Sequence, residues 1–186
     1  MPNSKTKLTI GTVVFDLETN GLLHNTTHIH CAAIYYEDEN DTDTFNDETP
    51  GKGLSFPVVR AVQHIQMANY IVGHNIVGFD LPIIKRLYPF FDPVGTIVDT
   101  LILSRLYHPN LLDIDKKHEW EGMPTKLYGS HSLEAYGYRL GERKGDYGKT
   151  TDWSSWSQEM ENYCKQDVQV TKKLCDHFNP YLSGSL

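Results

Sequence analysis

Acidic side chains that could hold divalent cations occur in three separate parts of the chain. Asp16 and Glu18 follow the β-rich stretch 8–15. Their spacing of two residues places both carboxylates on one face of a strand, where they can share one cation. Two carboxylates on the same side of a buried strand need a positive partner between them. The D-x-E pattern is also common at an exposed strand end, so both interpretations stay open from this pattern alone.

The second and third parts contribute Asp80 and the pair Tyr163 and Asp167. Asp80 stands at the start of an expected helix, five residues after Asn75. A carboxylate in a first helical turn is also a favourable partner of the helix dipole, so Asp80 alone does not identify a site. Tyr163 and Asp167 are four residues apart, which puts them on one face of a helix. A core tyrosine followed by an exposed acid explains this pair equally well.

The stretches around these residues predict an α/β domain. Runs of β-branched and aromatic residues predict strands, and apolar residues at helical spacing predict helices. We expect strands at 8–15, 28–37, 70–73 and 96–99, and helices at 57–69, 80–87, 100–107, 132–140 and from Ser155 or Ser157 to about 178. Strands that alternate with helices are typical of an α/β fold.

Two stretches have no clear period. Residues 37–53 contain seven acidic side chains among Asn, Thr and Pro, and we interpret them as an exposed turn or a short edge strand. Residues 110–129 are polar and contain Gly and Pro, so we expect a surface insertion there. We expect one domain over residues 1–186, because a chain of this length fits a single core.

Composition and charge exclude several classes of protein. Hydrophobic residues make up 39% and charged residues 22%, which excludes a disordered or collagen-like chain. The three cysteines are scattered, without a C-x-x-C pair, which indicates a reducing compartment and argues against a structural zinc site. Because no apolar run is long enough for a membrane span, we expect a cytoplasmic protein. A net charge of −7 disfavours nonspecific duplex binding but leaves metal-assisted contact with phosphates open.

Taken in order, the acidic motifs resemble those of the DEDD, or DnaQ-like, 3′–5′ exonucleases, which have an RNase H-like fold. DLE (16–18) matches the first family motif, HNIVGFD (74–80) the second and YCKQD (163–167) the third. Another branch of the family has His five residues before the last Asp. This chain has Asn162 there, so the resemblance implies the tyrosine subclass. It also implies a central mixed sheet of about five strands flanked by helices.

A closer resemblance covers nearly the whole chain. The segments 98–111 (VDTLILSRLYHPNL) and 129–147 (GSHSLEAYGYRLGERKGDY) are similar to the proofreading exonuclease domain of short-tailed phage family A DNA polymerases. The chain departs from that family because it stops after the third motif, without palm, fingers or thumb. A free-standing exonuclease, a proofreading subunit of a split polymerase and an excised domain all stay open. A phage origin would place the protein in the cytoplasm of a bacterial host.

The family resemblance also implies a two-metal mechanism. Asp16, Glu18 and Asp167, together with Asp80, would hold two Mg²⁺ or Mn²⁺ ions, since oxygen ligands suit these hard cations better than zinc. Tyr163 would aim the attacking water, because a tyrosine with a pKa of about 10 is a poor general base at neutral pH.

Contacts with the substrate are expected in three places. By family position, Leu17 and Thr19 would pack on the terminal sugar and base, and Asn75 would contact the strand near the scissile phosphate. Basic residues of the segment 139–149 could follow a single-strand backbone, although a solvated helix end explains them equally well. These basic residues are foremost Arg139, Arg143 and Lys144.

Other polar residues fit structural roles. His28, His30 and Cys31 lie on an expected strand, where successive side chains face opposite ways, and this alternation argues against a zinc site. Asp99 begins an expected helix, so capping or hydrogen bonding within the core explains it.

We therefore expect a metal-dependent 3′–5′ exonuclease that acts on single-stranded DNA 3′ ends and releases nucleoside 5′-monophosphates, alone or beside a phage-type DNA polymerase. An exoribonuclease that trims short RNA is one alternative, because contacts to the 2′-OH decide between the two substrates. A non-catalytic nucleic-acid-binding or polymerase-docking module is another alternative. The clustered acids argue against it, since a structural domain has no need for them.

Overall fold

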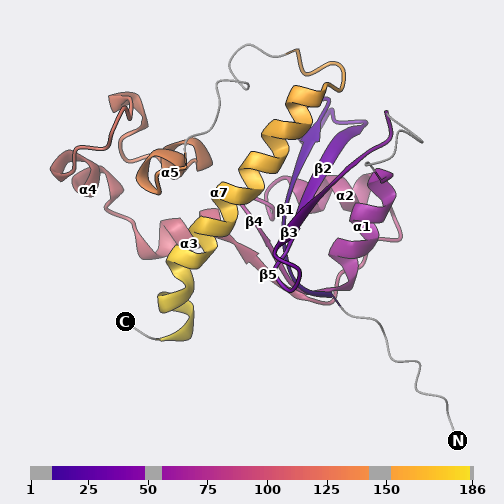
Figure 1. Ribbon diagram of the computed structural model, residues 1–186, viewed down its shortest axis with the longest axis horizontal. Helices are drawn as coiled ribbons and strands as arrows, with labels where there is room; N and C mark the ends of the chain where they lie inside the picture. Colours follow the sequence, from indigo (N-terminus) through magenta and orange to yellow (C-terminus); the bar gives the residue numbers. More distant parts are fainter. Residues whose placement is uncertain (1–9, 49–55, 143–151, 185–186) are drawn as a thin grey trace, which may run out of the picture.

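A five-stranded mixed sheet forms the centre of the protein (Figure 1). The computed structural model describes residues 10–48, 56–142 and 152–184. The strand order is β3-β2-β1-β4-β5, in which β1 pairs antiparallel with β2 and parallel with β4. The strands are β1 (Ile10–Thr19), β2 (Ile29–Tyr36), β3 (Asp41–Asn46), β4 (Ala68–Gly73) and β5 (Thr96–Asp99). The expected mixed sheet of about five strands is thus confirmed.

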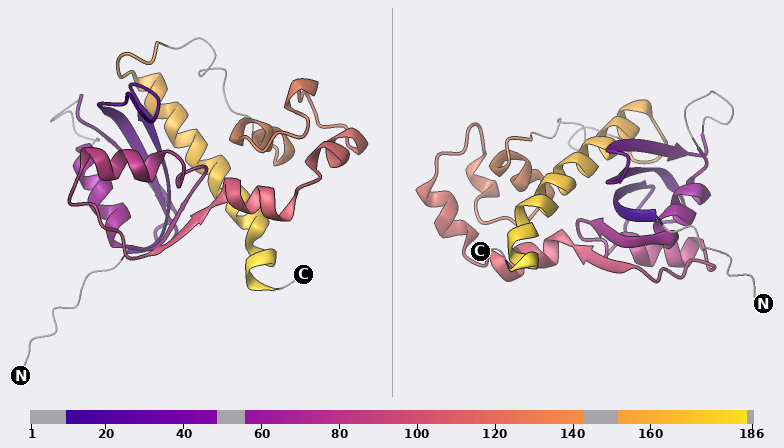
Figure 2. Two further views of the ribbon diagram at one scale, coloured as in Figure 1. Left: turned by 180° about the vertical axis from the view of Figure 1, so that it is seen from behind. Right: turned by 60° about the horizontal axis from the view of Figure 1, so that its bottom comes forward.

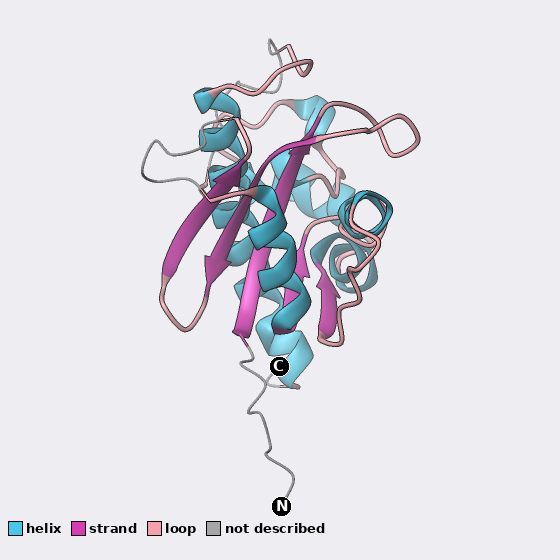
Figure 3. Cartoon of the chain, turned by 90° about the vertical axis from the view of Figure 1, so that its right-hand side faces the viewer, coloured by secondary structure: helices cyan, strands magenta, loops and turns pink. Residues whose placement is uncertain are grey.

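The central strand β1 carries two different apolar faces. Val13, Phe15 and Leu17 pack in a cluster with α1 (Val58–Met67) and α2 (Asp80–Leu87). Val14 points the other way and packs against α7 (Gln158–Ser183). Successive side chains of a strand alternate between its faces, so Asp16 and Glu18 continue the face that α7 covers. In Figure 3, α1 lies in front of the strands.

Helix α7 is buried on two sides because it lies between the sheet and a second group of helices (Figures 1 and 2). Met160, Cys164 and Val168 face the sheet. Val170 and Phe178 pack against the other helices, which are α3 (Thr100–Tyr107), α4 (Leu111–Lys117) and α5 (Leu133–Arg139). The long C-terminal helix therefore joins the sheet to the rest of the molecule.

The start of α7 is set by a side-chain cap. The hydroxyl oxygen of Ser157 accepts a hydrogen bond from the backbone N–H of Met160 at 3.1 Å, which satisfies one of the free donors of the first turn. Of the two serines expected to begin this helix, Ser157 is the cap. The helix continues to Ser183 rather than ending near residue 178.

Most expected elements are present, and the structure adds a helix that was not expected. Helices α2 and α3 and strand β5 have the expected bounds, and the acidic stretch contains β3 as an edge strand. The segment 110–129, expected to be a surface insertion, contains α4 and the 3₁₀ turn Thr125–Leu127, and its interpretation as an insertion stays a prediction. Leu111 of α4 is buried against α5 and α7. A helix of seven residues is too short to show a clear period, so this packing was not visible in the sequence.

No helix in the described parts of the chain is both long enough and apolar enough to cross a membrane.

Candidate active site

The expected carboxylates of the first motif lie between β1 and α7. Asp16 is half-buried and Glu18 is buried, both near the end of β1. The thiol of Cys164 on α7 donates a hydrogen bond to the backbone oxygen of Asp16 at 3.4 Å. This contact joins residues 148 positions apart in the sequence and brings the third motif against the first.

Asp16, Glu18 and Cys164 form a cluster in which one ligand atom of each residue lies within 4.8 Å of the others. Burial raises the pKa of the Cys164 thiol well above its usual range, and the nearby Cys31, Asp16 and Glu18 raise it further. Without a metal ion the thiol is protonated, and sulfur is a poor ligand for hard cations, which prefer oxygen. The two carboxylates are then the available donors, and they fit a hard cation such as Mg²⁺ or Mn²⁺.

Asp80 is the first residue of α2 and only 3% of its surface is exposed. Burial raises the pKa of its carboxyl to about 8, hydrogen bonds from the backbone N–H groups of Asp80 and Leu17 lower it, and the negative Asp99 raises it. The contact with Leu17 places the Asp80 carboxyl beside the D-x-E segment of β1. Without a cation nearby, this carboxyl is protonated at neutral pH.

Asp99 holds the loop that leads to Asp80. Its carboxylate accepts hydrogen bonds from the backbone N–H groups of Asn75 at 2.9 Å and Val77 at 3.0 Å. It also accepts one from Leu101 at 2.9 Å, and so caps α3. The expected capping role of Asp99 is confirmed. The same carboxylate also fixes the residues just before Asp80.

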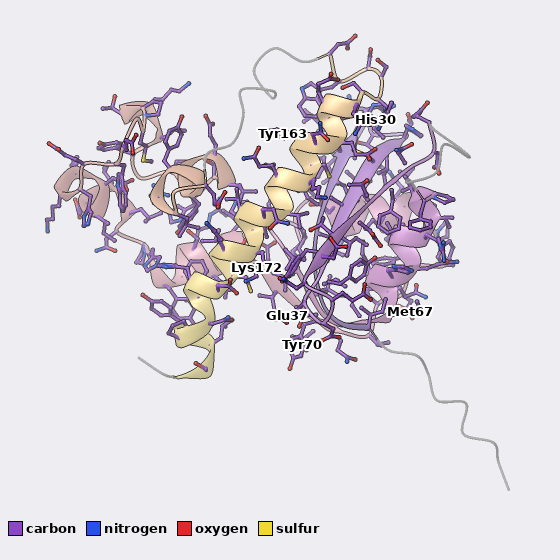
Figure 4. All side chains as sticks on the ribbon, viewed as in Figure 1. His30, Glu37, Met67, Tyr70, Tyr163 and Lys172 are labelled. Carbon is purple, nitrogen blue, oxygen red and sulfur yellow. The ribbon has the colours of Figure 1, made fainter. Side chains whose placement is uncertain are left out.

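The third motif lies on the face of α7 that meets the sheet. Tyr163 precedes Cys164 and is half-buried, and Asp167, one turn later, is buried. The ring of Trp153 meets the ring of Tyr163 edge-on, with centroids 6.4 Å apart. Figure 4 shows Tyr163 at the same end of the molecule as His30 of β2. Tyr163 therefore lies near the end of β1 that carries Glu18, because Glu18 pairs with Cys31.

A pocket of about 390 Å³ opens beside Glu18. Leu17 and Thr19, which were expected to contact the terminal nucleotide, both line it. Trp153 and Phe79 provide aromatic walls. The expected role of Leu17 and Thr19 stays a prediction, but their position next to a candidate metal ligand agrees with it. Cys164 lies within the third motif but was not expected to contact Asp16, and the sequence did not decide whether Trp153 packs in the core or lines the site.

Among the other expected substrate contacts, Asn75 and Arg139 are described by the structure, and neither lines this pocket. Asn75 has a left-handed backbone (φ 64°) and lines a different pocket together with Arg105. Arg139 is bonded to Asp115, with Nη2 and Oδ2 2.7 Å apart and only 5% and 0% of the two side chains exposed. Its guanidinium is thus occupied within the protein, and we do not retain it among the substrate contacts. The two remaining residues, Arg143 and Lys144, lie outside the described residues.

Comparison with protein families identifies the wider group. A family model described as the RNase H superfamily matches residues 13–179. The chain belongs to the RNase H superfamily. This result confirms the expected fold family of the sheet and its flanking helices. The tyrosine subclass, which depends on Tyr163, stays a prediction.

Two sequence relatives of this RNase H superfamily member are phage DNA polymerases. The DNA-directed DNA polymerase of Enterobacteria phage T3 is 36% identical over 187 residues, which is 88% of this chain and 26% of the relative. The DNA-directed DNA polymerase of Escherichia phage T7 is 34% identical over 186 residues, with the same coverage. The resemblance to phage polymerases is confirmed, and the chain spans about a quarter of their length.

Solved structures with a similar fold include two nucleases. A structure described as the apo form of the nuclease has a TM-score of 0.58 and 18% identity. The match covers 94% of this chain and 74% of the nuclease chain. The EXO domain of Aedes aegypti Nibbler has a TM-score of 0.60 and 10% identity. The match covers 97% of this chain and 83% of the Nibbler chain. At these identities the similarity supports the RNase H-like fold alone.

Proposed function

We propose that this chain is a metal-dependent exonuclease that removes nucleotides from the 3′ end of single-stranded DNA. One observation carries the proposal: Asp16 and Glu18 on β1 lie against Cys164, which follows Tyr163 on α7, and the Asp80 carboxyl is hydrogen-bonded to the backbone of Leu17, which separates the two β1 carboxylates in the sequence. Membership of the RNase H superfamily and the two phage DNA polymerase relatives support the choice of a nucleic acid substrate.

The four carboxylates would hold two divalent cations, Mg²⁺ or Mn²⁺. The donor set fits these ions, because the carboxylates are buried or half-buried acids at a site where the neighbouring thiol stays neutral. When bound, such cations lower the pKa of a water, neutralise charge on the phosphoryl group and stabilise the leaving oxygen. Asp80 would release its proton on metal binding, since its pKa is about 8 without a cation.

The residues around the carboxylates would orient the substrate and the water. Tyr163 would hydrogen-bond the attacking water and aim it, and the edge-on contact with Trp153 restricts its ring. Leu17 and Thr19 would pack on the terminal sugar and base in the pocket beside Glu18. The aromatic wall of Trp153 would stack on that base, an interaction that tolerates any sequence.

We further propose a DNA polymerase as the partner of this domain, because both relatives are polymerases of which the chain matches about a quarter. Two alternatives stay in place beside the exonuclease: an exoribonuclease of the same superfamily, and a nucleic-acid-binding or docking module without chemistry.

The decisive experiment is a time course with purified protein on a 5′-labelled single-stranded DNA. We expect a ladder that shortens from the 3′ end with Mg²⁺ and no cleavage with EDTA. A matched RNA oligonucleotide separates the two nucleases, since faster loss of RNA would identify an exoribonuclease. A 3′-blocked DNA tests direction, because shortening from the 5′ end would contradict the proposed polarity. Absence of any metal-dependent cleavage would favour the non-catalytic module.

A further inference from the structure

A second cluster of metal-binding side chains lies outside the carboxylate site. We propose that His28, His30 and Glu48 form a zinc site between the start of β2 and the residues that follow β3. One ligand atom from each of the three residues lies within 4.8 Å of the others. None of the three belongs to the acidic motifs, so this inference does not depend on the proposed nuclease function.

A β-bulge lies at the end of β2 where the two histidines stand. Glu18 pairs with Cys31 and Thr19 pairs with Ile29, so His30 is the extra residue on β2. Ile29 packs in the cluster of α1 and α2, whereas the side chain of His30 reaches the segment before α7. Alternation along a strand argued in the sequence against a site that joins His30 with the adjacent Cys31, but it does not separate His28 from His30. The third member of the cluster in the structure is Glu48 rather than Cys31.

His30 presents one nitrogen that only a cation or a donor can satisfy. Its side chain is 97% buried, since 3% is exposed, and its Nε2 lies 3.1 Å from the backbone oxygen of Trp153. A carbonyl oxygen only accepts, so Nε2 carries the proton and Nδ1 keeps its lone pair. Among the described residues, none hydrogen-bonds to Nδ1. A metal-binding histidine typically donates its other ring N–H to a backbone carbonyl in this way, which fixes the tautomer.

His28 and Glu48 have the separation of two ligands of one zinc ion. His28 Nε2 lies 3.3 Å from Glu48 Oε1, and this nitrogen has no hydrogen bond in the described parts of the chain. Two ligands about 2.0–2.1 Å from a tetrahedral zinc lie roughly 3.3 Å apart. An ordinary ion pair would satisfy His28 and Glu48 but not His30 Nδ1. A cation at the centre satisfies all three atoms, and imidazole with carboxylate ligands suits zinc.

The bound zinc would fix the segment before α7 to the sheet. His30 holds the backbone oxygen of Trp153, and Trp153 both contacts the ring of Tyr163 and lines the pocket beside Glu18. Zinc would therefore stabilise the wall of the candidate active site without entering it. Three protein ligands leave a fourth position of the ion for water.

The test is a zinc titration of the full chain in competition with a chromophoric chelator. The background carries Asp16→Asn and His177→Gln, which remove the first-motif carboxylate and the exposed pair His108 and His177 as competing ligands. We expect one equivalent of zinc to bind. Adding His28→Gln or Glu48→Gln weakens binding at least about tenfold, whereas the control His24→Gln, at an exposed histidine nearby, leaves it unchanged.

Two results would overturn the site. One is that the background protein binds no zinc, and the other is that His28→Gln and Glu48→Gln bind it as tightly as His24→Gln. Circular dichroism checks that each variant is folded, and both substituted side chains are partly exposed, at 40% and 46%. X-ray absorption at the zinc edge adds a second readout: nitrogen and oxygen neighbours alone support the site, and a sulfur neighbour contradicts it.

Discussion

The Asp16 carboxylate lies close to both Glu18 and Cys164. A substitution that removes its charge is therefore the first test of the carboxylate site. Asp16→Asn keeps the shape of the side chain and loses one metal ligand. We expect it to slow cleavage of a DNA 3′ end at least about 100-fold, which exceeds the roughly 10–100-fold loss typical when a group that only hydrogen-bonds to a metal ligand is removed. The measurement is the initial rate on 5′-labelled single-stranded DNA with Mg²⁺.

The control for this substitution is Asp113→Asn on the exposed side of α4. It removes the same charge far from the first motif in sequence and should leave the rate unchanged. The Asp16 variant should also remain folded without metal, because it removes one of two neighbouring negative charges. An unfolded Asp16 variant, or equal rates for the two variants, would speak against the carboxylate site.

A substitution of Tyr163 tests whether this residue orients the attacking water or acts like a metal ligand. Tyr163→Phe removes the hydroxyl but keeps the ring that packs against Trp153. We expect the rate to fall by roughly tenfold, below the ~10²–10⁴-fold contribution of a general acid or base. The rate of this variant is compared with that of Asp16→Asn under identical conditions. A loss as large as that of the ligand variant would contradict the orienting role.

At the scale of elements, one buried ion pair holds α4 to the end of α5. Arg139 donates to Asp115 and to the backbone oxygen of Ser130. Burial raises the pKa of Asp115, but hydrogen bonds from Arg139 and Gly129 outweigh it and hold the pKa below its usual range. We expect Arg139→Met to lower the free energy of unfolding by about 3 kcal/mol, because it leaves a buried carboxylate without its partner.

A surface ion pair offers the matched control for that change. Lys173 and Glu142 also pair, but both side chains are well exposed. Lys173→Met should therefore cost less than about 1 kcal/mol. Urea unfolding of both variants measures the difference. The double variant Asp115→Asn with Arg139→Met should recover part of the loss, whereas equal stabilities of the two single variants would contradict a structural role for Arg139.

At the scale of the whole molecule, several histidines make the fold sensitive to acid. Burial lowers the pKa of each, and positive neighbours lower some of them further; the residues are His64, His108, His131 and His177. Below about pH 6.5 the unfolded chain then binds more protons than the native protein. Their contribution to stability is fully present above that pH, and we expect it to be lost as the pH falls.

His64 is the histidine to test, because its Nδ1 lies 2.6 Å from the hydroxyl of the buried Tyr36 on β2. We expect the stability of His64→Gln to fall less steeply than that of the wild type between pH 7.5 and 5.5. Urea midpoints of both proteins in one EDTA-containing buffer measure this difference. The raised pKa of Asp80 has the opposite effect, because it lowers stability as the pH rises toward 8. This contribution is the same in the wild type and the variant, so it cancels in the comparison of their slopes. Identical slopes would contradict a lowered pKa of His64.

The order and spacing of the acidic motifs were readable along the chain because they depend on local geometry. Asp16 and Glu18 share a face through the two-residue period of a strand. Tyr163 and Asp167 share a face through the four-residue period of a helix. Helix α2 has the expected bounds because its first residue, Asp80, follows a loop and its last turn precedes Pro89. That residues 1–186 form one domain stays a prediction.

Contacts between distant segments were not readable, because no local period links them. The sequence alone left Arg139 as a candidate for DNA binding, and only the fold places Asp115, 24 residues away, against its guanidinium. Alternation argued against a site that joins the adjacent His30 and Cys31, and only the fold brings Glu48, from beyond β3, to the two histidines. Such side-chain contacts depend on which surfaces meet when the elements pack together, and the local sequence does not determine that.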